Sequence, residues 1–394
     1  MDQSLVCYFK APHSFTGEDV VELHCHGSPI VLRTIIDATL TLDARLATAG
    51  EFTLRAVANG RMKLSEAEAI RDLIDAQTDA AVRHATRQMK GEISHALQPL
   101  KDALLRVIVR LESSLEFVED DLPQLEHKQM LEAVRQVCAT FKQMAATFQQ
   151  GKLLRDGLRV TLIGRPNVGK SSVFNGLLGL QRAIVHDVPG TTRDTITESI
   201  GIDGIPIAIT DTAGLRIASD QVEMIGVDRT KREAADSDLL IVVIDGSEPL
   251  TNEDRNALLE AVNLPHIIAL NKSDLPTFSK AVVDTHNASA SSIVSISAKT
   301  GHGLESLREA LLHPFTNGNL SSEGLMITNA RHHDLLLRAI DAVSSSESLL
   351  AGHASEELTL VGLHEALRYL GEITGETTSD QILGEIFSTF CIGK

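Results

Sequence analysis

The sequence predicts an α/β domain inserted into an all-α domain, with a partial α+β region in front of them. Between residues 157 and 315, apolar runs typical of strands alternate with helical patterns, which indicates a largely parallel sheet covered on both faces. Residues 64–155 and 325–388 show helical spacing of apolar residues almost throughout. We expect these two helical stretches to pack together, because their weakly amphipathic faces need a partner. The expected divisions are 1–60, 61–156, 157–315 and 316–394.

Composition restricts the class of protein. A chain of 394 residues is too long for one core, and its 43% hydrophobic and 23% charged residues are typical of a soluble globular protein. No apolar run is long enough to span a membrane. The net charge of −17 argues against nucleic-acid binding over the whole surface, although a local basic patch or a partner that carries the RNA is compatible with it. The 4 cysteines form no CxxC pair, which favours the reducing cytoplasm and offers no zinc-site spacing.

The first region carries a strand pattern at Asp19–His26 and a helical pattern at Ile30–Leu40. His24 and His26 share one face of the strand and could be metal ligands. Without a third ligand at a recognisable spacing, a solvated or packed strand face is the favoured interpretation.

The first helical stretch contains two local signals and one basic stripe. Ser65–Glu68 resembles a capping box, and Pro99 is expected to start, end or kink a helix. Arg83, Arg87 and Lys90 lie on one helical face. A solvated face is the default interpretation, and a contact with tRNA or a protein partner is the alternative.

The α/β stretch holds six expected strands: Leu158–Ile163, Thr195–Ile202, Ile205–Thr210, Leu239–Ile244, His266–Leu270 and Ile293–Ile296. The first strand runs into Gly164–Ser171, which a helical pattern follows, and this is the context of a phosphate-binding P-loop. Its glycines let successive N–H groups point at phosphate oxygens, and the following helix adds its positive end. Lys170 can reach the β- and γ-phosphates, and the Ser171 hydroxyl can ligate Mg²⁺.

Two later loops predict which base is bound. Asp274 in Asn271–Asp274 can accept the N1 and N2 hydrogens of guanine, while Asn271 contacts the base and the adjacent loop. The stem of Lys272 can lie along the ring, and the loop Ser297–Lys299 offers a backbone N–H to the guanine oxygen. These loops follow predicted strands, so the sequence predicts GTP.

Two further loops predict the γ-phosphate and metal contacts. Asp211 can hold a Mg²⁺-bound water, and the Gly214 N–H can contact the γ-phosphate. Gly190–Asp194 lies where a switch loop is expected, and a threonine there would complete the Mg²⁺ shell. The predicted GTP-binding residues are Gly164, Asn167, Val168, Gly169, Lys170, Ser171, Ser172, Thr191, Thr192, Asp211, Gly214, Asn271, Lys272, Asp274, Ser297, Ala298 and Lys299.

Leu215 occupies the position at which Ras-like proteins carry the glutamine that orients water. Glu223 is our candidate for that role, so the predicted catalytic residues are Glu223, Lys170 and Gly214. Arg193 could act as an arginine finger, but a solvent-exposed salt bridge fits it equally well. A cation between the phosphates and loop carbonyls could supply the missing positive charge.

Several segments together resemble the MnmE (TrmE) family of tRNA uridine-modification GTPases. They span the chain: Ser14–Leu23, Gly50–Thr53, Glu66–Asp75, Gln77, Asn167, Gly190–Asp194, Asp211–Arg216 and Phe390–Lys394. The resemblance implies an N-terminal folate-binding and dimerisation domain, a split helical domain and an inserted G domain. It implies that the protein adds an aminomethyl-type group at carbon 5 of the wobble uridine of certain tRNAs, with the FAD protein MnmG as partner.

The resemblance also implies cofactors and their ligands. GTP, Mg²⁺, K⁺ and a tetrahydrofolate derivative would be used, in a homodimer that forms a heterotetramer with MnmG. GTP hydrolysis would be stimulated by K⁺ as the G domains of one dimer meet. The implied ligands are Ser171 and Thr192 for Mg²⁺; Asn167, His186, Val188 and Thr191 for K⁺; and Glu22, Arg61 and Lys394 for folate, with Cys391 facing the folate site.

The chain departs from the family in three places. It begins inside the N-terminal domain, so either Met1 is a misassigned start or the domain is shortened, and folate binding and constitutive dimerisation are in question. Gly27–Ser28 replaces the usual Gly-Gly, and Arg61 replaces a more usual lysine. Cys391 also fits the spacing of a C-terminal prenylation motif, but Lys394 at the last position disfavours that modification. The interpretation without a function is that Cys391 is a buried small hydrophobic residue.

Two other functions compete with tRNA modification. One is a GTP-regulated ribosome-assembly switch of the Era or Der type, and such proteins carry a basic RNA-binding domain where Ser321–Lys394 is helical and acidic. The other is a shortened chain that keeps GTP hydrolysis without the modification chemistry.

Overall fold

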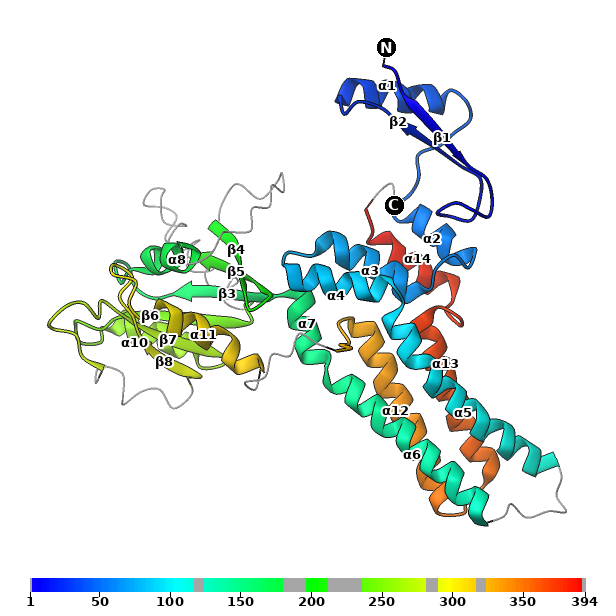
Figure 1. Ribbon diagram of the computed structural model, residues 1–394. Helices are drawn as coiled ribbons and strands as arrows, with labels where there is room; N and C mark the ends of the chain where they lie inside the picture. The colour runs from blue at the N-terminus through cyan, green and yellow to red at the C-terminus, as the bar shows by residue number, and fades with distance from the viewer. Residues whose placement is uncertain are drawn as a thin grey trace. The chain divides into compact units, whose positions relative to one another are not determined.

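The structure is a computed structural model that describes residues 2–116, 124–179, 196–211, 236–280, 290–316 and 324–391. The chain divides into two compact units (Figure 1). Unit 1 comprises residues 1–75, 83–146 and 329–394, and unit 2 comprises residues 76–82 and 147–328.

Unit 2 is an α/β unit built on a sheet of six strands in its described part. The strands are β3 (Leu158–Ile163), β4 (Ile196–Ile202), β5 (Ile205–Asp211), β6 (Leu239–Asp245), β7 (His266–Asn271) and β8 (Ser292–Ser295). Each expected strand is confirmed, with ends that differ by at most one residue. The order is β4-β5-β3-β6-β7-β8, in which only β4 pairs antiparallel with its neighbour.

Helices cover both faces of this sheet. They are α7 (Phe148–Asp156), α8 (Lys170–Gly179), α10 (Asn252–Ala261) and α11 (Leu304–Thr316). Along β6, Leu239 and Ile241 belong to one hydrophobic cluster, while Leu240 and Val242 belong to another. This alternation arises because successive side chains of a strand point to opposite faces. The sheet is therefore buried on both sides, which explains the continuous apolar sequence of β6.

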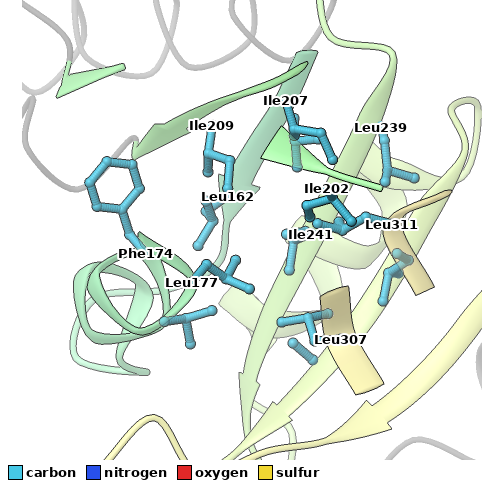
Figure 2. Packing of buried hydrophobic residues seen from close by; sticks show 14 of the residues in the cluster. Leu162, Phe174, Leu177, Ile202, Ile207, Ile209, Leu239, Ile241, Leu307 and Leu311 are labelled. Atoms are coloured by element: carbon cyan, nitrogen blue, oxygen red, sulfur yellow. The ribbon is translucent and has the colours of Figure 1, made fainter. Parts of the chain in front are cut away.

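Figure 2 shows the larger of the two clusters. Phe174 and Leu177 of α8 and Leu307 of α11 pack against strand residues such as Leu162 and Ile209. Burial of large aliphatic and aromatic side chains stabilises a fold by roughly 1.5–3 kcal/mol each. This packing fixes α8, and therefore the loop that precedes it, relative to the strand ends.

Unit 1 contains a bundle of four long helices. They are α5 (Glu92–Glu116), α6 (Gln124–Ala146), α12 (Ala330–Ala351) and α13 (Glu356–Thr374). Each packs on two others, in the cycle α5, α6, α12, α13, so the helices from the two ends of the sequence lie side by side (Figure 1). Glycines follow the last residues of α12 and α13, where Gly352 and Gly375 are the C-caps.

Two expectations for the helical stretch can be compared with the structure. Pro99 lies inside α5, so it neither starts nor ends a helix, which leaves a kink as the remaining alternative. Ser65 does not cap a helix, because it lies within α3 (Leu64–Asp75), where its Oγ is 3.3 Å from the Oγ of Ser94. The backbone N–H of Lys63 instead donates to the carboxylate of Glu66 at 3.0 Å.

The remaining elements of unit 1 are shorter. They are β1 (Leu5–Phe9), β2 (Val20–His24), α1 (Pro29–Leu40), α2 (Glu51–Ala58) and α14 (Asp380–Ser388), and α4 (Asp79–Met89) runs across the boundary between the units. β1 and β2 pair antiparallel, and Phe387 and Phe390 at the end of the chain pack with Leu64 and Ala67. Among the described residues, no helix is both long and apolar enough to cross a membrane.

The two histidines of the first region contact different carboxylates. His24 Nε2 lies 3.1 Å from Glu22 Oε2, and His26 Nδ1 lies 2.6 Å from Asp2 Oδ1. No cluster of three or more metal-ligating side chains is found in the part of the chain that the structure describes. Both rings are exposed, but β2 ends at His24, so the expectation that His26 shares its strand face is wrong.

Candidate nucleotide-binding site

The predicted GTP-binding residues that the structure describes lie at one edge of the sheet in unit 2. β3, β5, β6 and β7 run parallel, so their carboxyl ends meet at the same edge. Gly164 follows β3, while Asp211 ends β5 and Asn271 ends β7. Segments distant in the sequence are thus brought together where ligands bind in open α/β sheets.

The loop between β3 and α8 requires its glycines. Gly164 has a φ of 145°, and a Cβ there would lie 2.4 Å from the carbonyl oxygen of Val243. Gly169 has a φ of 100°, and a Cβ there would lie 2.3 Å from Nδ2 of Asn271. Asn167 adopts a φ of 63°, a left-handed conformation that asparagine tolerates better than most residues. The chain is therefore curled as an anion-binding loop requires.

The first turn of α8 presents the cationic and hydroxyl groups. The ammonium of Lys170 is buried, and it donates to the carbonyl oxygens of Gly164 and Arg165, both at 2.9 Å. The hydroxyl of Ser171 donates to Asp211 Oδ2 at 2.7 Å. Val168 is fully buried beneath the loop, and Ser172 is exposed. Lysine, serine and aspartate thus converge beside the curled backbone.

The loop that reads the base is tied to the P-loop. Asn271 is buried, and its Nδ2 donates to the carbonyl oxygen of Val168 at 2.8 Å, while its Oδ1 accepts from the N–H of Ala298 at 3.0 Å. The hydroxyl of Ser297 donates to Asp274 Oδ1 at 2.7 Å. This hydrogen bond lowers the pKa of the Asp274 carboxyl, and the positive charges of Lys299 and Lys272 lower it further. Asp274 is therefore held as a carboxylate, the form that accepts hydrogen bonds.

The sequence analysis missed a group of charges beside these loops. Asp245 ends β6, and its buried carboxylate accepts a hydrogen bond from the ammonium of Lys272. Arg165 of the P-loop lies beside it and forms ion pairs with Glu248 at 2.8 Å and Asp254 at 3.2 Å. The signal was available, because Asp245 ends a parallel strand as Asp211 and Asn271 do.

Some predicted residues lie outside the described residues. They are His186, Val188, Thr191, Thr192, Arg193, Gly214, Leu215, Glu223 and Lys394. Of the predicted K⁺ ligands, only Asn167 is described, and of the predicted Mg²⁺ ligands, only Ser171 is described.

The predicted folate ligands lie in unit 1. Glu22 is on β2, and Arg61 follows α2, where its Nε donates to the carbonyl oxygen of Ser14 at 3.1 Å. Arg61 borders a cleft of about 390 Å³ that Lys63 and Glu376 also line, whereas Glu22 is not among its lining residues. Cys391 is exposed, so its interpretation as a buried small hydrophobic residue is wrong.

The basic stripe on α4 is partly neutralised. Arg87 Nε lies 3.6 Å from Glu92 Oε2, whereas Arg83 and Lys90 are exposed. The default interpretation as a solvated face agrees with this exposure.

Comparison with known sequences decides the family. A family model described as the MnmE helical domain matches residues 64–391, and one described as the GTP-binding protein TrmE N-terminus matches residues 1–61. The chain belongs to the MnmE family. Two MnmE relatives named tRNA modification GTPase, from Aquifex aeolicus and Finegoldia magna, are 41% and 42% identical to it. Each alignment covers 100% of this chain and 87% of the relative.

A solved structure is also similar to this member of the MnmE family. It is the G domain of the FeoB iron transporter of T. maritima, 30% identical, which covers 40% of this chain and 97% of that chain with a TM-score of 0.31. At that TM-score the likeness adds no support to the assignment. Membership in the MnmE family favours tRNA modification over a ribosome-assembly switch, because the relatives matched over the whole chain carry the former name.

Proposed function

We propose that this protein is a GTPase that acts in tRNA modification, and that the edge of the sheet in unit 2 binds GTP. The observation that carries the proposal is the joining of two loops by Asn271, whose amide bonds both Val168 and Ala298. With this arrangement, the P-loop and Asp274 lie at the same edge of the sheet. The printed names of the full-length relatives supply the link to tRNA modification.

Guanine selection is assigned to Asp274. A carboxylate accepts hydrogen bonds from the N1–H and N2 amino group of guanine, whereas an amide can donate to a carbonyl oxygen at the same position. Asp274→Asn should therefore weaken GTP binding by about 100-fold and strengthen the binding of xanthosine triphosphate, in which an oxygen replaces the amino group. The measurement is competition against a fluorescent GDP analogue. Unchanged preference for guanine would disprove the assignment.

Mg²⁺ binding suits the oxygen donors at the P-loop. The hydroxyl of Ser171 and the carboxylate of Asp211 are hard ligands of the kind that Mg²⁺ prefers, and both lie beside Lys170. Bound Mg²⁺ would neutralise charge on the β- and γ-phosphates, with Ser171 and Thr192 as its direct protein ligands. Lys170 would bind the same phosphates once its ammonium leaves the two loop carbonyls.

Hydrolysis is proposed to depend on Glu223 and K⁺. Glu223 would orient the attacking water, Gly214 would contact the γ-phosphate, and Asn167, His186, Val188 and Thr191 would hold K⁺ where two G domains meet. Replacing KCl by NaCl should lower the turnover of GTP by about tenfold or more, since one positive charge near the transferred phosphoryl group would be lost. Equal rates in the two salts would remove K⁺ from the mechanism, while GTP binding would be unaffected.

We also propose that this protein carries out the tRNA modification that its resemblance to the MnmE family implies. The protein would act with MnmG on carbon 5 of the wobble uridine, as a homodimer in a larger assembly, with a tetrahydrofolate derivative near Glu22, Arg61, Cys391 and Lys394. The test is the nucleoside composition of tRNA after incubation with this protein, MnmG, GTP, the folate derivative and an amine that supplies the nitrogen. Absence of the modified uridine in a mixture that hydrolyses GTP would separate GTPase activity from modification.

The domain organisation is also part of the proposal. The G domain would span residues 157–315 and would be inserted in a helical domain formed by residues 61–156 and 316–394. The first 60 residues would belong to the folate-binding domain. Support comes from the packing of α5 and α6 against α12 and α13, which are separated in the sequence by the whole α/β stretch. Expression of residues 157–315 alone as a folded, GTP-binding protein would test it.

A further inference from the structure

One buried carboxylate in unit 2 is shared by both nucleotide-contacting loops. The side chain of Asp245 is 2% exposed, and its Oδ2 accepts the ammonium of Lys272. Nη2 of Arg165, from the P-loop, lies 4.0 Å from the same oxygen. A buried carboxylate is costly unless cations and hydrogen bonds compensate its charge. Asp245 therefore constrains one cation from each loop.

The other oxygen of Asp245 is fixed as well. Oδ1 accepts hydrogen bonds from the backbone N–H of Ser247 at 3.0 Å and from its hydroxyl at 2.6 Å. The strand register places Asp245 directly opposite Asn271, the residue before Lys272. The carboxylate thus has one orientation, set by β6 and by its own loop. Burial raises the pKa of Asp245, but the hydrogen bonds from Lys272 and Ser247 outweigh burial and lower it.

The backbone and side chain of Lys272 indicate why its ammonium is bound to Asp245. The φ of Lys272 is 66°, in the left-handed region that non-glycine residues seldom adopt. Its side chain is 35% exposed, so the stem is accessible to a ligand while the ammonium is bound to Asp245. A long side chain held at its charged end presents its methylene groups as a fixed apolar surface.

We propose that Asp245 is a positioning residue for guanine recognition, acting through Lys272. It holds the ammonium so that the lysine stem lies ready along the face of the base. This inference rests on the proposed function of the site and adds to it a residue that touches neither base nor phosphate. Arg165, which is bound to the same carboxylate group and to Asp254, keeps the P-loop at a fixed distance from the base loop.

The test is the dissociation rate of a fluorescent GDP analogue from the full chain. Asp245→Asn keeps the shape of the side chain but removes its charge, and we expect dissociation about tenfold faster, as for the loss of one buried ionic hydrogen bond. Lys272→Met keeps an apolar stem but removes the ammonium, and we expect a similar increase. Because both changes break the same interaction, the double variant should release the analogue about as fast as either single variant.

Controls separate positioning from a general loss of structure. Glu248→Gln removes the exposed partner of Arg165, and we expect its dissociation rate to stay within about twofold of the wild-type rate. The folding of Asp245→Asn itself is checked by circular dichroism, which should match that of the wild type. If that variant does not fold, Ser247→Ala replaces it, with an expected increase of about threefold because one hydrogen bond to Asp245 is lost.

Three outcomes would overturn the inference or its basis. A wild-type dissociation rate in Asp245→Asn would show that the carboxylate does not act on guanine binding. Multiplying effects, with the double variant about 100-fold faster, would show that Asp245 does not act through Lys272. Failure of the wild-type chain to retain the GDP analogue would instead contradict the proposed function, so the two failures are distinguishable.

Discussion

The Nδ2 group of Asn271 donates a hydrogen bond to the carbonyl oxygen of Val168 at 2.8 Å. Because the same amide accepts a hydrogen bond from Ala298, one buried side chain joins the P-loop, the end of β7 and the loop after β8. The arrangement needs both a donor and an acceptor on a short side chain, which asparagine supplies. Asn271 therefore links these three segments through its hydrogen bonds.

Replacing this amide should affect both stability and GTP binding. Asn271→Ala leaves the Val168 carbonyl and the Ala298 N–H without their partner, and a buried unsatisfied group costs about 1–3 kcal/mol. We expect that loss in the unfolding free energy of unit 2, measured by chemical denaturation, and weaker binding of GTP. Asn252→Ala, at an exposed position at the start of α10, is the matched control and should change neither quantity. A stable Asn271→Ala protein would show that the loops are held by other contacts.

The glycine that faces Asn271 should tolerate no side chain. Gly169→Ala combines a φ of 100° with a Cβ placed 2.3 Å from Asn271 Nδ2, so both backbone strain and a clash oppose it. We expect GTP binding to be lost, as measured by equilibrium titration. Gly301→Ala is the control for strain alone, since its φ is 83° but a Cβ there meets nothing within 4 Å. If both variants lose binding equally, strain and not the clash is responsible.

Sequence patterns predicted the strands of unit 2 and the residues at their ends because both depend on local order. Apolar runs are detectable without tertiary structure, and a parallel sheet brings its strand ends to one edge. The position of Asp245 at the end of a parallel strand could have been predicted in the same way. Its partner could not, because the ion pair with Lys272, in the loop after β7, joins two distant segments and leaves no short motif.

In unit 1, by contrast, local sequence patterns were less reliable guides to the structure. Ser65–Glu68 fits the spacing of a capping box, yet Ser65 bonds Ser94 and Glu68 is buried against α12. Local spacing cannot distinguish a cap from a buried ion pair, because the partners Arg331 and His332 are more than two hundred residues away. Pro99 neither starts nor ends a helix, because the packing of α5 in its bundle outweighs the cost of a proline in the helix.

The ion pair of Glu68 should make unit 1 sensitive to acid. Burial raises the pKa of its carboxyl, but the charges and hydrogen bonds of His332 and Arg331 outweigh burial and lower the pKa from 4.5 to about 2. A group whose pKa is lowered on folding stabilises the fold above its unfolded pKa, and this contribution disappears as pH falls through the folded value. We therefore expect stability to be lost between about pH 5 and pH 2, as followed by helical circular dichroism.

A variant can isolate this contribution. Glu68→Gln keeps the volume but leaves Arg331 and His332 without their anion, which should cost about 3 kcal/mol at neutral pH. Its unfolding free energy should then fall less steeply with acid than that of the wild type. Glu347→Gln breaks a more exposed pair with Arg135 and is the control, expected to cost less than about 1 kcal/mol. Equal acid sensitivity in Glu68→Gln and wild type would assign the effect to other carboxyl groups.

The end of the chain should detach when Gly50 is replaced. Gly50 has a φ of 66°, its N–H donates to the carbonyl oxygen of Cys391 at 3.3 Å, and a Cβ there would lie 2.7 Å from the carbonyl oxygen of Phe387. Gly50→Ala should therefore displace α14 and expose Phe387 and Phe390, with faster hydrogen exchange confined to residues 380–391. GTP hydrolysis in unit 2 should be unchanged, whereas tRNA modification should fall about tenfold or more, since Cys391, which we propose to lie near the folate derivative, would lose its position.

A second glycine of the same region provides the comparison. Gly60 also has a positive φ, 68°, but a Cβ there meets nothing within 4 Å, so Gly60→Ala carries the strain without the clash. Thr389→Val tests the same attachment by another route, because it removes the hydroxyl that accepts from Arg71 Nη1 at 2.6 Å, and Thr389→Ser should restore it. If Gly50→Ala exchanges hydrogen as slowly at residues 380–391 as Gly60→Ala does, then the packing of Phe387 and Phe390 holds the end of the chain without help from Gly50.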